Sequence, residues 1–445
     1  MSLPSVSAHQ GNALGSMHSH KAFLLLSIPL ILSALSTPLL GAVDTAVVGQ
    51  LKDPVYIGAV AVGALIFNYL YWILGFLRVS TSGFTAQADG AGDSNELVMA
   101  FVRPFLLGLG FGLVFLLLHK PILQGALFFI HPSDEVAALV EQYYAIRIWG
   151  APLSLANYAV YGWLIGRSKV KLAMWMQLLL NGMNIVLDFV FVLGLDMGVE
   201  GVAWATLASE ALVFLIGAIA VWLHISRIPK TWSSLYDSKR FLEMLSVNRD
   251  MFLRTCCLLL VLGLFTSAGA GQGDDVLAAN AILMQIALLI SYIFDGFANA
   301  GSIWVGKAYG QRSELLLRHT IKLGAVWSFA AALVITIALV VFHRSLLSLF
   351  TESVMVSELA GQYSIWLLIF PIVIFWGLML AGIFNGATDS VPTRNSMVIS
   401  MLVFVLILYS TSSWLGNHGL WFAYIAFSLV RSITLWYYLS KIKAI

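Results

Sequence analysis

The chain has 445 residues, of which 60% are hydrophobic and 10% are charged, and its formal net charge is +2. About a quarter of the residues in a soluble domain are charged, so this composition excludes a soluble protein and indicates a polytopic membrane protein. The basic residues fall in short clusters between apolar runs, and no nucleic-acid-binding surface is indicated.

Twelve apolar runs are long enough to cross a bilayer, which takes about 20 residues per helix. Their approximate cores are 22–50, 56–85, 96–118, 135–165, 170–194, 199–225, 249–272, 276–306, 314–342, 355–386, 391–414 and 418–440. We therefore expect an all-α fold with twelve transmembrane helices. Two shorter apolar pieces, 120–132 and 343–350, are expected to lie along the membrane interface.

The lysine and arginine residues predict the orientation of these helices. With the N-terminus inside, fifteen basic residues lie at the inner loops and helix ends, and only Lys52, Lys120 and Arg344 lie outside. Cytoplasmic loops carry an excess of basic residues, so we expect both termini in the cytoplasm.

The chain repeats itself at an offset of about 220 residues. Pro152 and Pro371 are 219 apart, and Gly162 and Gly382 are 220 apart. Further pairs are Gly166 with Gly386, Gly198 with Gly416 and Gly201 with Gly419. Six helices per half is an even number, so the halves run in the same direction, related by an axis along the membrane normal.

This repeat predicts the organisation of the chain. We expect a cytoplasmic tail (1–21), a first lobe (22–225), a cytoplasmic linker (226–248) and a second lobe (249–445). Two such pseudo-symmetric bundles form a cavity between them and suit alternating access. The architecture indicates a transporter rather than an enzyme.

The first apolar run carries two prolines, Pro29 and Pro38, and one carboxylate, Asp44. A charged group at membrane depth is costly and marks function, while proline inside a helix marks a kink. We interpret Asp44 as the coupling carboxylate and the two prolines as conformational hinges.

The fifth run carries a polar stripe, because Asn181, Asn184 and Asp188 are spaced by three and four residues and share one helix face. Asp44 and Asp188 each lie eight residues from the expected outer end of their helix, which is about 12 Å. Tyr143 and Thr206 fall near the same depth, and Asn157 lies deeper.

Two carboxylates in a low dielectric repel each other, which favours proton binding by at least one of them. This set predicts a proton switch or, as the alternative, a cage for a small cation. Packing between helices is the structural alternative for Asp188.

Three further charged residues lie away from helix ends, namely Arg78, Glu210 and Asp295. The sequence leaves their roles open between helix packing, ion pairing and function. No acid stands at the position of the second half that is equivalent to Asp188, so the ion site is expected in the first half only.

These features together resemble the multidrug and toxic compound extrusion (MATE) family, and within it the DinF-type branch. The resemblance rests on the PLLGAVDTAVVGQL segment, the ADGAGD and AYGQRS turns, and N-x-x-x-D in the fifth helix. It implies a twelve-helix, two-bundle fold of the MATE/MOP type in the bacterial inner membrane. It also implies proton-coupled export of cationic or amphipathic drugs. The matching positions are Asp44, Tyr143, Asn184, Asp188 and Thr206, with Pro29 at the bend of the first helix. The sodium-coupled branch that resembles NorM carries acids within helices seven and ten, which this chain lacks.

The resulting expectation is an antiporter that works by alternating access as a monomer, with H⁺ as the coupling ion, no cofactor and no metal site. Asp44, Asn157 and Asn181 are expected to contact the substrate. Sodium coupling at the same site and a flippase of lipid-linked saccharides are the alternatives within the superfamily. An intramembrane protease is disfavoured, because the GxGD sequence at 271–274 lies at a helix end and lacks a partner aspartate. A channel would be distinguished by its ion currents.

Overall fold

The computed structural model describes residues 19–50, 54–226, 237–351 and 353–442. Within these ranges it describes all side chains except those of Leu39, Ala42, Asp44, Thr45, Val48, Ser412 and Ser413. Every regular element in the described part is helical.

The elements follow one another along the chain without strands in the described ranges. They are α2 (His20–Val48), α3 (Pro54–Leu74), α4 (Phe76–Ala91), α5 (Ser94–Leu117), α6 (His119–Ile130), α7 (Asp134–Arg147), η1 (Ile148–Gly150), α8 (Ala151–Gly166), α9 (Val170–Asp188), η2 (Phe189–Gly194), α10 (Gly198–Ile225), α11 (Ser238–Ala270), α12 (Asp274–Gln311), α13 (Glu314–Leu347), α14 (Val354–Gly386), α15 (Ser390–Leu415) and α16 (Asn417–Leu439).

Eleven helical stretches of the described chain are long and apolar enough to cross a membrane, and α3 and α4 together form one of them, Val55–Ala91. The expected crossing at 135–165 is divided into α7, the short 3₁₀ turn η1 and α8. Pro152 stands directly after this turn, where its missing N–H interrupts the helical hydrogen bonds. The expected crossing is therefore built from three consecutive helical segments, with the interruption beside Pro152.

The two short apolar pieces have different outcomes. Residues 120–132 largely form α6, a separate short helix. Residues 343–350 do not form a separate element, because α13 continues to Leu347 and ends in a turn. The repeat is therefore less exact at this point than the sequence suggested.

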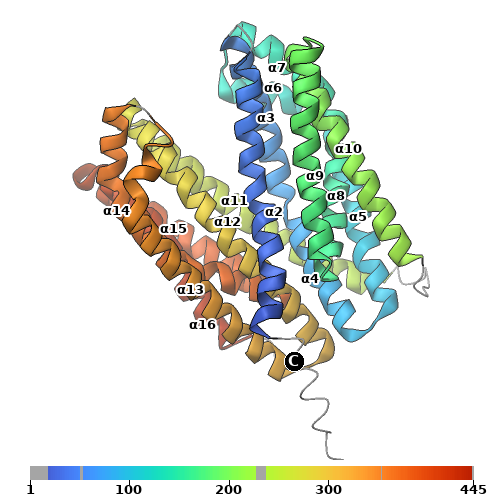
Figure 1. Cartoon of the computed structure of the whole chain (residues 1–445). Helices are drawn as coiled ribbons and strands as arrows, with labels where there is room; N and C mark the ends of the chain where they lie inside the picture. The colour runs from blue at the N-terminus through green and yellow to red at the C-terminus, as the bar shows by residue number, and fades with distance from the viewer. Residues whose placement is uncertain (1–18, 51–53, 227–236, 352, 443–445) are drawn as a thin grey trace, which may run out of the picture.

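Figure 1 shows two groups of helices, α2–α10 and α11–α16, which diverge at one end of the molecule and meet at the other. They meet at the end where α2 begins. There the lower part of α2 packs on α12, with the Phe23 ring 5.4 Å from the Trp304 ring and stacked on Phe297 at 6.3 Å. The upper part of α2 packs on α9 of its own group.

The backbone repeats the symmetry that the sequence indicated. Left-handed backbone occurs at Gly92 and Arg312, at Ser168 and Thr388, and at Gly198 and Gly416. The first two pairs are 220 residues apart and the third is 218 apart. Equivalent turns in the two bundles thus need the same reversal of the chain.

The paired glycines mark equivalent helix contacts. A Cβ atom at Gly162 of α8 would lie 2.6 Å from the carbonyl oxygen of Arg78 in α4. In the second bundle, a Cβ atom at Gly382 of α14 would meet the carbonyl oxygen of Ala298 in α12. Only glycine lets these backbones approach so closely, which is typical of small residues at membrane helix interfaces.

The end at which the bundles meet is held by polar contacts between α4 and the second bundle. Asp89 forms ion pairs with Arg167 (2.5 Å) in its own bundle and with Lys307 (3.0 Å) in the other. Gln87 Nε2 donates to the carbonyl oxygen of Gly386 (3.0 Å) and to Thr388 Oγ1 (3.1 Å). These contacts join the bundles at the end where α2 begins.

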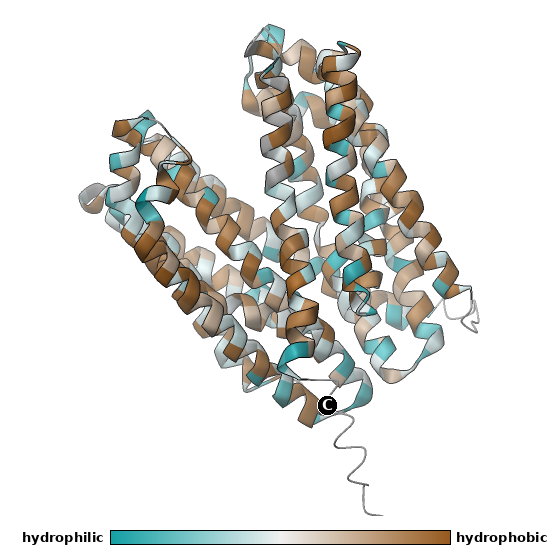
Figure 2. Cartoon of the chain, viewed as in Figure 1, coloured by the Kyte–Doolittle hydropathy of each residue, from teal (hydrophilic) through white to brown (hydrophobic). Residues whose placement is uncertain are grey.

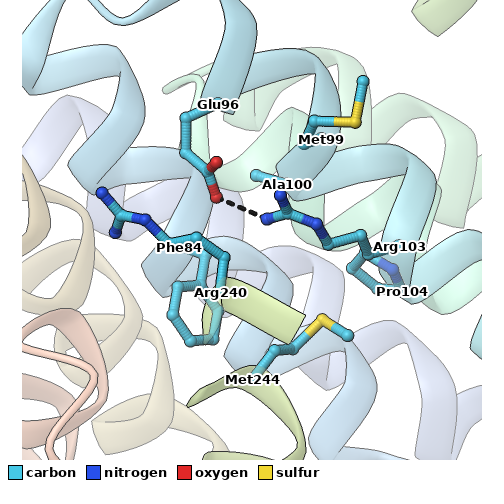
Figure 3. A pocket seen from close by; sticks show the side chains of 8 residues that line it. All are labelled: Phe84, Glu96, Met99, Ala100, Arg103, Pro104, Arg240 and Met244. Atoms are coloured by element: carbon cyan, nitrogen blue, oxygen red, sulfur yellow. Dashed lines mark hydrogen bonds and ion pairs between the residues drawn. The ribbon is translucent and has the colours of Figure 1, made fainter. Parts of the chain in front are cut away.

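Of the expected linker, residues 227–236 lie outside the described part of the chain. The remainder, from Ser238, is the first part of α11, which Asp237 caps. Figure 3 shows Arg240 and Met244 of this segment beside α5, where Arg103 Nη1 donates to Glu96 Oε1 at 2.7 Å. The start of α11 is therefore packed against the first bundle.

Figure 2 shows hydrophobic residues along the outer sides of the helices, including α13. The exposed side chains of α13 include Val334, Ile337 and Val341, each more than 60% exposed. Large apolar side chains that face outward at this density fit contact with lipid. The chain is a multi-pass membrane protein with the expected fold class.

Candidate functional site

The polar stripe of α9 is buried. Asp188 is 0% exposed, Asn184 1% and Asn181 6%. Asp188 is the last residue of α9, and the chain continues from it as the π-helical segment η2. Such π-helical turns are frequently found at functional sites.

Asn184 joins α9 to α10. Its Nδ2 donates to Thr206 Oγ1 at 3.2 Å, and Thr206 Oγ1 donates in turn to the carbonyl oxygen of Val202 at 2.9 Å. Two of the residues predicted for the site are thereby in direct contact. Asn184 lies one helical turn before Asp188, so the hydroxyl and the amide are within one turn of the buried carboxyl.

Asn181 joins α9 to α2. Its Nδ2 donates to Ser36 Oγ at 2.9 Å, and its Oδ1 accepts from Gln177 Nε2 at 3.1 Å. Ser36 lies between the two prolines of α2. The polar face of α9 is thus attached to the segment of α2 that was predicted to bend.

Asp44 lies in α2, and its side chain is outside the described residues. Its height along the helix follows from the Ser36–Asn181 contact. Ala22 and Leu25 share a pocket with Val170 and Leu172, so α2 and α9 run parallel. Asp44 is eight residues beyond Ser36 and Asp188 is seven beyond Asn181, which is about 12 Å and about 10 Å of rise. The backbones of the two aspartates therefore lie at nearly the same level.

Tyr143 and Asn157 are buried, at 4% and 6% exposure, but in different surroundings. The Tyr143 ring lies against Gly63 of α3, where a Cβ atom would be 2.5 Å from Cδ1, and its centroid is 6.3 Å from that of Phe67. Asn157 lies in α8, and its Oδ1 accepts no hydrogen bond from a described residue. No hydrogen bond between described residues joins Asn157 to the stripe of α9.

Pro29 and Pro38 both lie inside α2, which continues through them. Near Pro29, Ile31 of α2 packs directly on Gly296 of α12. Pro29 therefore lies where α2 is held by the second bundle, whereas Ser36 and Pro38 lie where it is held by the first. The helix is not broken at either proline in this conformation.

Glu210, whose role the sequence left open, belongs to an ion pair that sequence reasoning missed. Its Oε2 accepts from Arg147 Nη1 at 2.9 Å and from Ser154 Oγ at 2.6 Å. The Arg147 guanidinium also lies over the rings of Phe67 (5.0 Å) and Tyr71 (5.9 Å). A lone acid and a lone base at similar depth in neighbouring helices were the available signal.

Within the described part of the chain, no three His, Cys, Asp or Glu side chains are arranged to hold a metal ion. The groups gathered along α9 are carboxyl, amide and hydroxyl groups from α9, α10 and α2. Such groups can hydrogen-bond both a protonated and an ionised carboxyl.

Known proteins resemble this chain in sequence and in fold. The MatE family model matches residues 29–190 and 251–410. DNA damage-inducible protein F of Escherichia coli (strain K12) is 39% identical over 94% of this chain and 91% of its own length. A probable multidrug resistance protein NorM of Bradyrhizobium diazoefficiens is 24% identical over 90% of this chain and 89% of its own length.

Solved structures have the same architecture. An outward-facing conformation of a multidrug resistance MATE family transporter of the MOP superfamily superposes with a TM-score of 0.86, at 24% identity over 95% of this chain and 96% of the other. A MATE structure in the bent conformation gives a TM-score of 0.87, at 24% identity over 95% of each chain. The family model matches both halves of the chain, and the Escherichia coli relative is 39% identical over 94% of it. This chain therefore belongs to the MatE family of membrane transporters and is not an enzyme.

Proposed function

We propose that this protein is a proton-coupled antiporter of the bacterial inner membrane, which exports cationic or amphipathic compounds by alternating access. The observation that carries the proposal is Asp188, a fully buried carboxyl at the junction of α9 and a π-helical turn. Ionisable side chains inside membrane spans are rare, and they mark proton relays and ion pathways. The names of relatives as multidrug resistance proteins support the substrate class.

The proposed coupling unit is Asp188 with Asp44 at the same level of α2. Protonation of the pair removes charge between α2 and α9. The hydrogen bonds of Asn184 and Thr206 then rearrange, and α2 bends near Pro29. Asn181 of α9 transmits the change, because it is hydrogen-bonded to Ser36 of α2, the helix that bends. The ionised carboxylates bind the cationic group of the next substrate, with Asn157 and Asn181 as further contacts.

The arrangement of the bundles supports an outward-facing state. They meet where α2 begins and diverge at its other end (Figure 1). With the N-terminus in the cytoplasm, as the distribution of basic residues indicates, the closed end faces inward. The Asp89 ion pairs then lie on the cytoplasmic side.

The test is substrate efflux from proteoliposomes under an imposed pH gradient or, separately, an imposed sodium gradient. We expect a pH gradient alone to drive efflux. Asp44→Asn and Asp188→Asn should each abolish the pH-driven component, while Asp134→Asn, at the exposed start of α7, should retain it. Thermal unfolding in detergent checks that the variants are folded.

Two results would contradict the proposal. Wild-type efflux rates in both Asp44→Asn and Asp188→Asn would exclude these groups as the coupling site. Efflux driven by sodium alone would instead favour a cation cage at the same residues.

A further inference from the structure

A second group of charged side chains lies apart from the α9 site, in the interior of the membrane-spanning helices. It consists of Arg254 of α11, Asp295 of α12, Arg431 of α16 and Arg78 near the start of α4. Each lies near the middle of its span; the spans are Ser238–Ala270, Asp274–Gln311, Asn417–Leu439 and Val55–Ala91. We call these four residues the arginine cluster.

The single acid of the arginine cluster interacts with each of its three bases. Asp295 interacts electrostatically with Arg431, Arg254 and Arg78, most strongly with Arg431. Arg431 also interacts with Arg254, as like charges that repel each other. None of the ion pairs in the described part of the chain includes a member of the cluster. The four groups are therefore close enough to interact without being joined in a closed ion pair.

Arg78 places the cluster at the boundary between the bundles. It interacts electrostatically with Tyr158 and Tyr161 of α8 in the first bundle and with Tyr292 and Asp295 of α12 in the second. The side chain of Arg78 is exposed, whereas Arg254 and Asp295 are half-buried. Arg78 is thus the most exposed member of the cluster.

Arg431 is the innermost member. It is 6% exposed, and its Nη2 is buried and donates no hydrogen bond to any described residue. A buried donor that makes no hydrogen bond is costly, and more so when it is charged. An arginine in this state is poised for an acceptor that comes from outside the chain.

The charges of the cluster do not balance, since three guanidinium groups face one carboxylate. The nearest other acid on α11, Asp250, is already bound to Arg249 and Arg394 (3.0 and 2.8 Å) and to Ser390. An uncompensated positive charge at membrane depth is expensive. The planar guanidinium group matches the geometry of carboxylate and phosphate.

We propose that Arg254 and Arg431 bind the anionic group of an amphipathic molecule, with Arg78 reaching the same group from the other bundle. Asp295 is the internal counter-ion that the incoming anion replaces. The inference rests on the proposed function only in naming this molecule as the exported substrate. It changes the substrate class, since the substrate then carries an acidic group in addition to any cationic one.

The experiment measures binding without transport. The full chain in nanodiscs of zwitterionic lipid is titrated with dansylamino-undecanoate and with a dansyl alkyl quaternary ammonium of matched length. We expect the anion to bind wild type, and Arg254→Gln and Arg431→Gln to weaken it about tenfold or more, which is the scale of one charge-assisted hydrogen bond. Arg431→Lys should recover part of the loss. Arg318→Gln, a control at a 72% exposed arginine, should leave affinity unchanged.

A second variant keeps the test valid if the arginine variants do not fold. Asp295→Asn removes the competing carboxylate, so the anion should bind more tightly than to wild type. Unchanged or weaker anion binding in Asp295→Asn, or unchanged binding in both arginine variants, would overturn the site. Equal or stronger binding of the quaternary ammonium through the same arginines would do so too.

Two further arms separate the sources of the anionic group. Repeating the titration in nanodiscs of anionic lipid should give the same affinity if the site takes a substrate. Competition by the lipid that disappears in Arg431→Gln would instead assign the site to a lipid headgroup and overturn the substrate assignment. Because no gradient is imposed, loss of pH-driven efflux in Asp188→Asn leaves this result unaffected, and the two proposals fail independently.

Discussion

Glu210 and Asp188 are both acids inside membrane-spanning helices, but their surroundings give them different chemistry. Glu210 is bound by a guanidinium and a hydroxyl, at 2.9 and 2.6 Å. Asp188 is fully buried on a helix face whose neighbouring side chains are amides and a hydroxyl. An ion pair between helices is a structural role for an acid, whereas amide and hydroxyl groups beside a carboxyl can both donate hydrogen bonds to it and accept them from it. These different surroundings separate Glu210, a structural acid, from Asp188, the proposed coupling acid.

The Arg147–Glu210 pair leads to a prediction on stability. Glu210→Leu leaves the 7% exposed Arg147 side chain without its partner, and removing one member of a buried pair typically costs about 3–5 kcal/mol. We expect thermal unfolding in detergent to occur at a clearly lower temperature. The double variant Arg147→Met/Glu210→Leu should recover most of the loss. If the single and double variants unfold alike, the pair does not contribute through its charges.

At the scale of elements, α2 differs from the other helices because both bundles hold it. Phe23 and Ile31 pack on α12, and Ser36 is bonded to α9. Pro29 lies in the part held by the second bundle, where it leaves the carbonyl oxygen of Leu25 without its helical donor. A change at the level of Asp44 can therefore reach both bundles through one helix.

Pro29→Ala tests this role of α2. Alanine restores the missing backbone hydrogen bond and removes the clash, which favours a straight helix. We expect slower pH-driven efflux without loss of thermal stability. A spin-label pair that spans α2 and α12 should show a narrower distance distribution across a pH titration. Pro104→Ala, at a proline inside α5, is the matched control, and an equal effect there would argue against a specific hinge.

The contact between α14 and α12 gives a second prediction at this scale. Gly382→Ala places a Cβ atom against the Ala298 carbonyl oxygen, and overpacking of this kind costs about 1–3 kcal/mol. Gly361→Ala on the same helix meets nothing within 4 Å and should be neutral or slightly stabilising. Thermal unfolding of the two variants, measured side by side, distinguishes close packing from helix propensity. Equal unfolding temperatures would show that α14 can move away from α12 at no cost.

At the scale of the whole molecule, the two bundles are joined at one end by a small set of polar contacts. Asp89 is the centre of this set, because it binds Arg167 in one bundle and Lys307 in the other. Its side chain is only 20% exposed, which limits screening by solvent. An alternating-access transporter must break this contact to open its other side.

Asp89→Asn should therefore shift the conformational balance of the molecule. We expect spin labels on the ends of α4 and α12 to report a larger share of long distances than in wild type, because the closed end loses an ion pair across the bundles. Glu314→Gln removes the exposed pair with Arg318 inside α13 and should leave the distances unchanged. Identical distance distributions in Asp89→Asn and wild type would show that the Asp89 ion pairs do not set the balance between conformations.

The sequence by itself determined the fold class, the membrane-spanning helices and the buried face of α9. These depend on local patterns, because apolar runs mark the crossings, repeated glycines mark equivalent helix contacts, and a spacing of three and four puts Asn181, Asn184 and Asp188 on one face. The stripe could be found because the other residues between Asn181 and Asp188 are apolar, so that a polar residue there needs a buried partner.

Only the tertiary structure decided which polar groups meet. Arg147 and Glu210 are 63 residues apart, and the arginine cluster draws on four helices from both bundles, so no local pattern in the chain could pair them. Periodicity is a property of one helix, whereas an ion pair between helices depends on their relative rotation and depth, which the packing of the whole bundle sets.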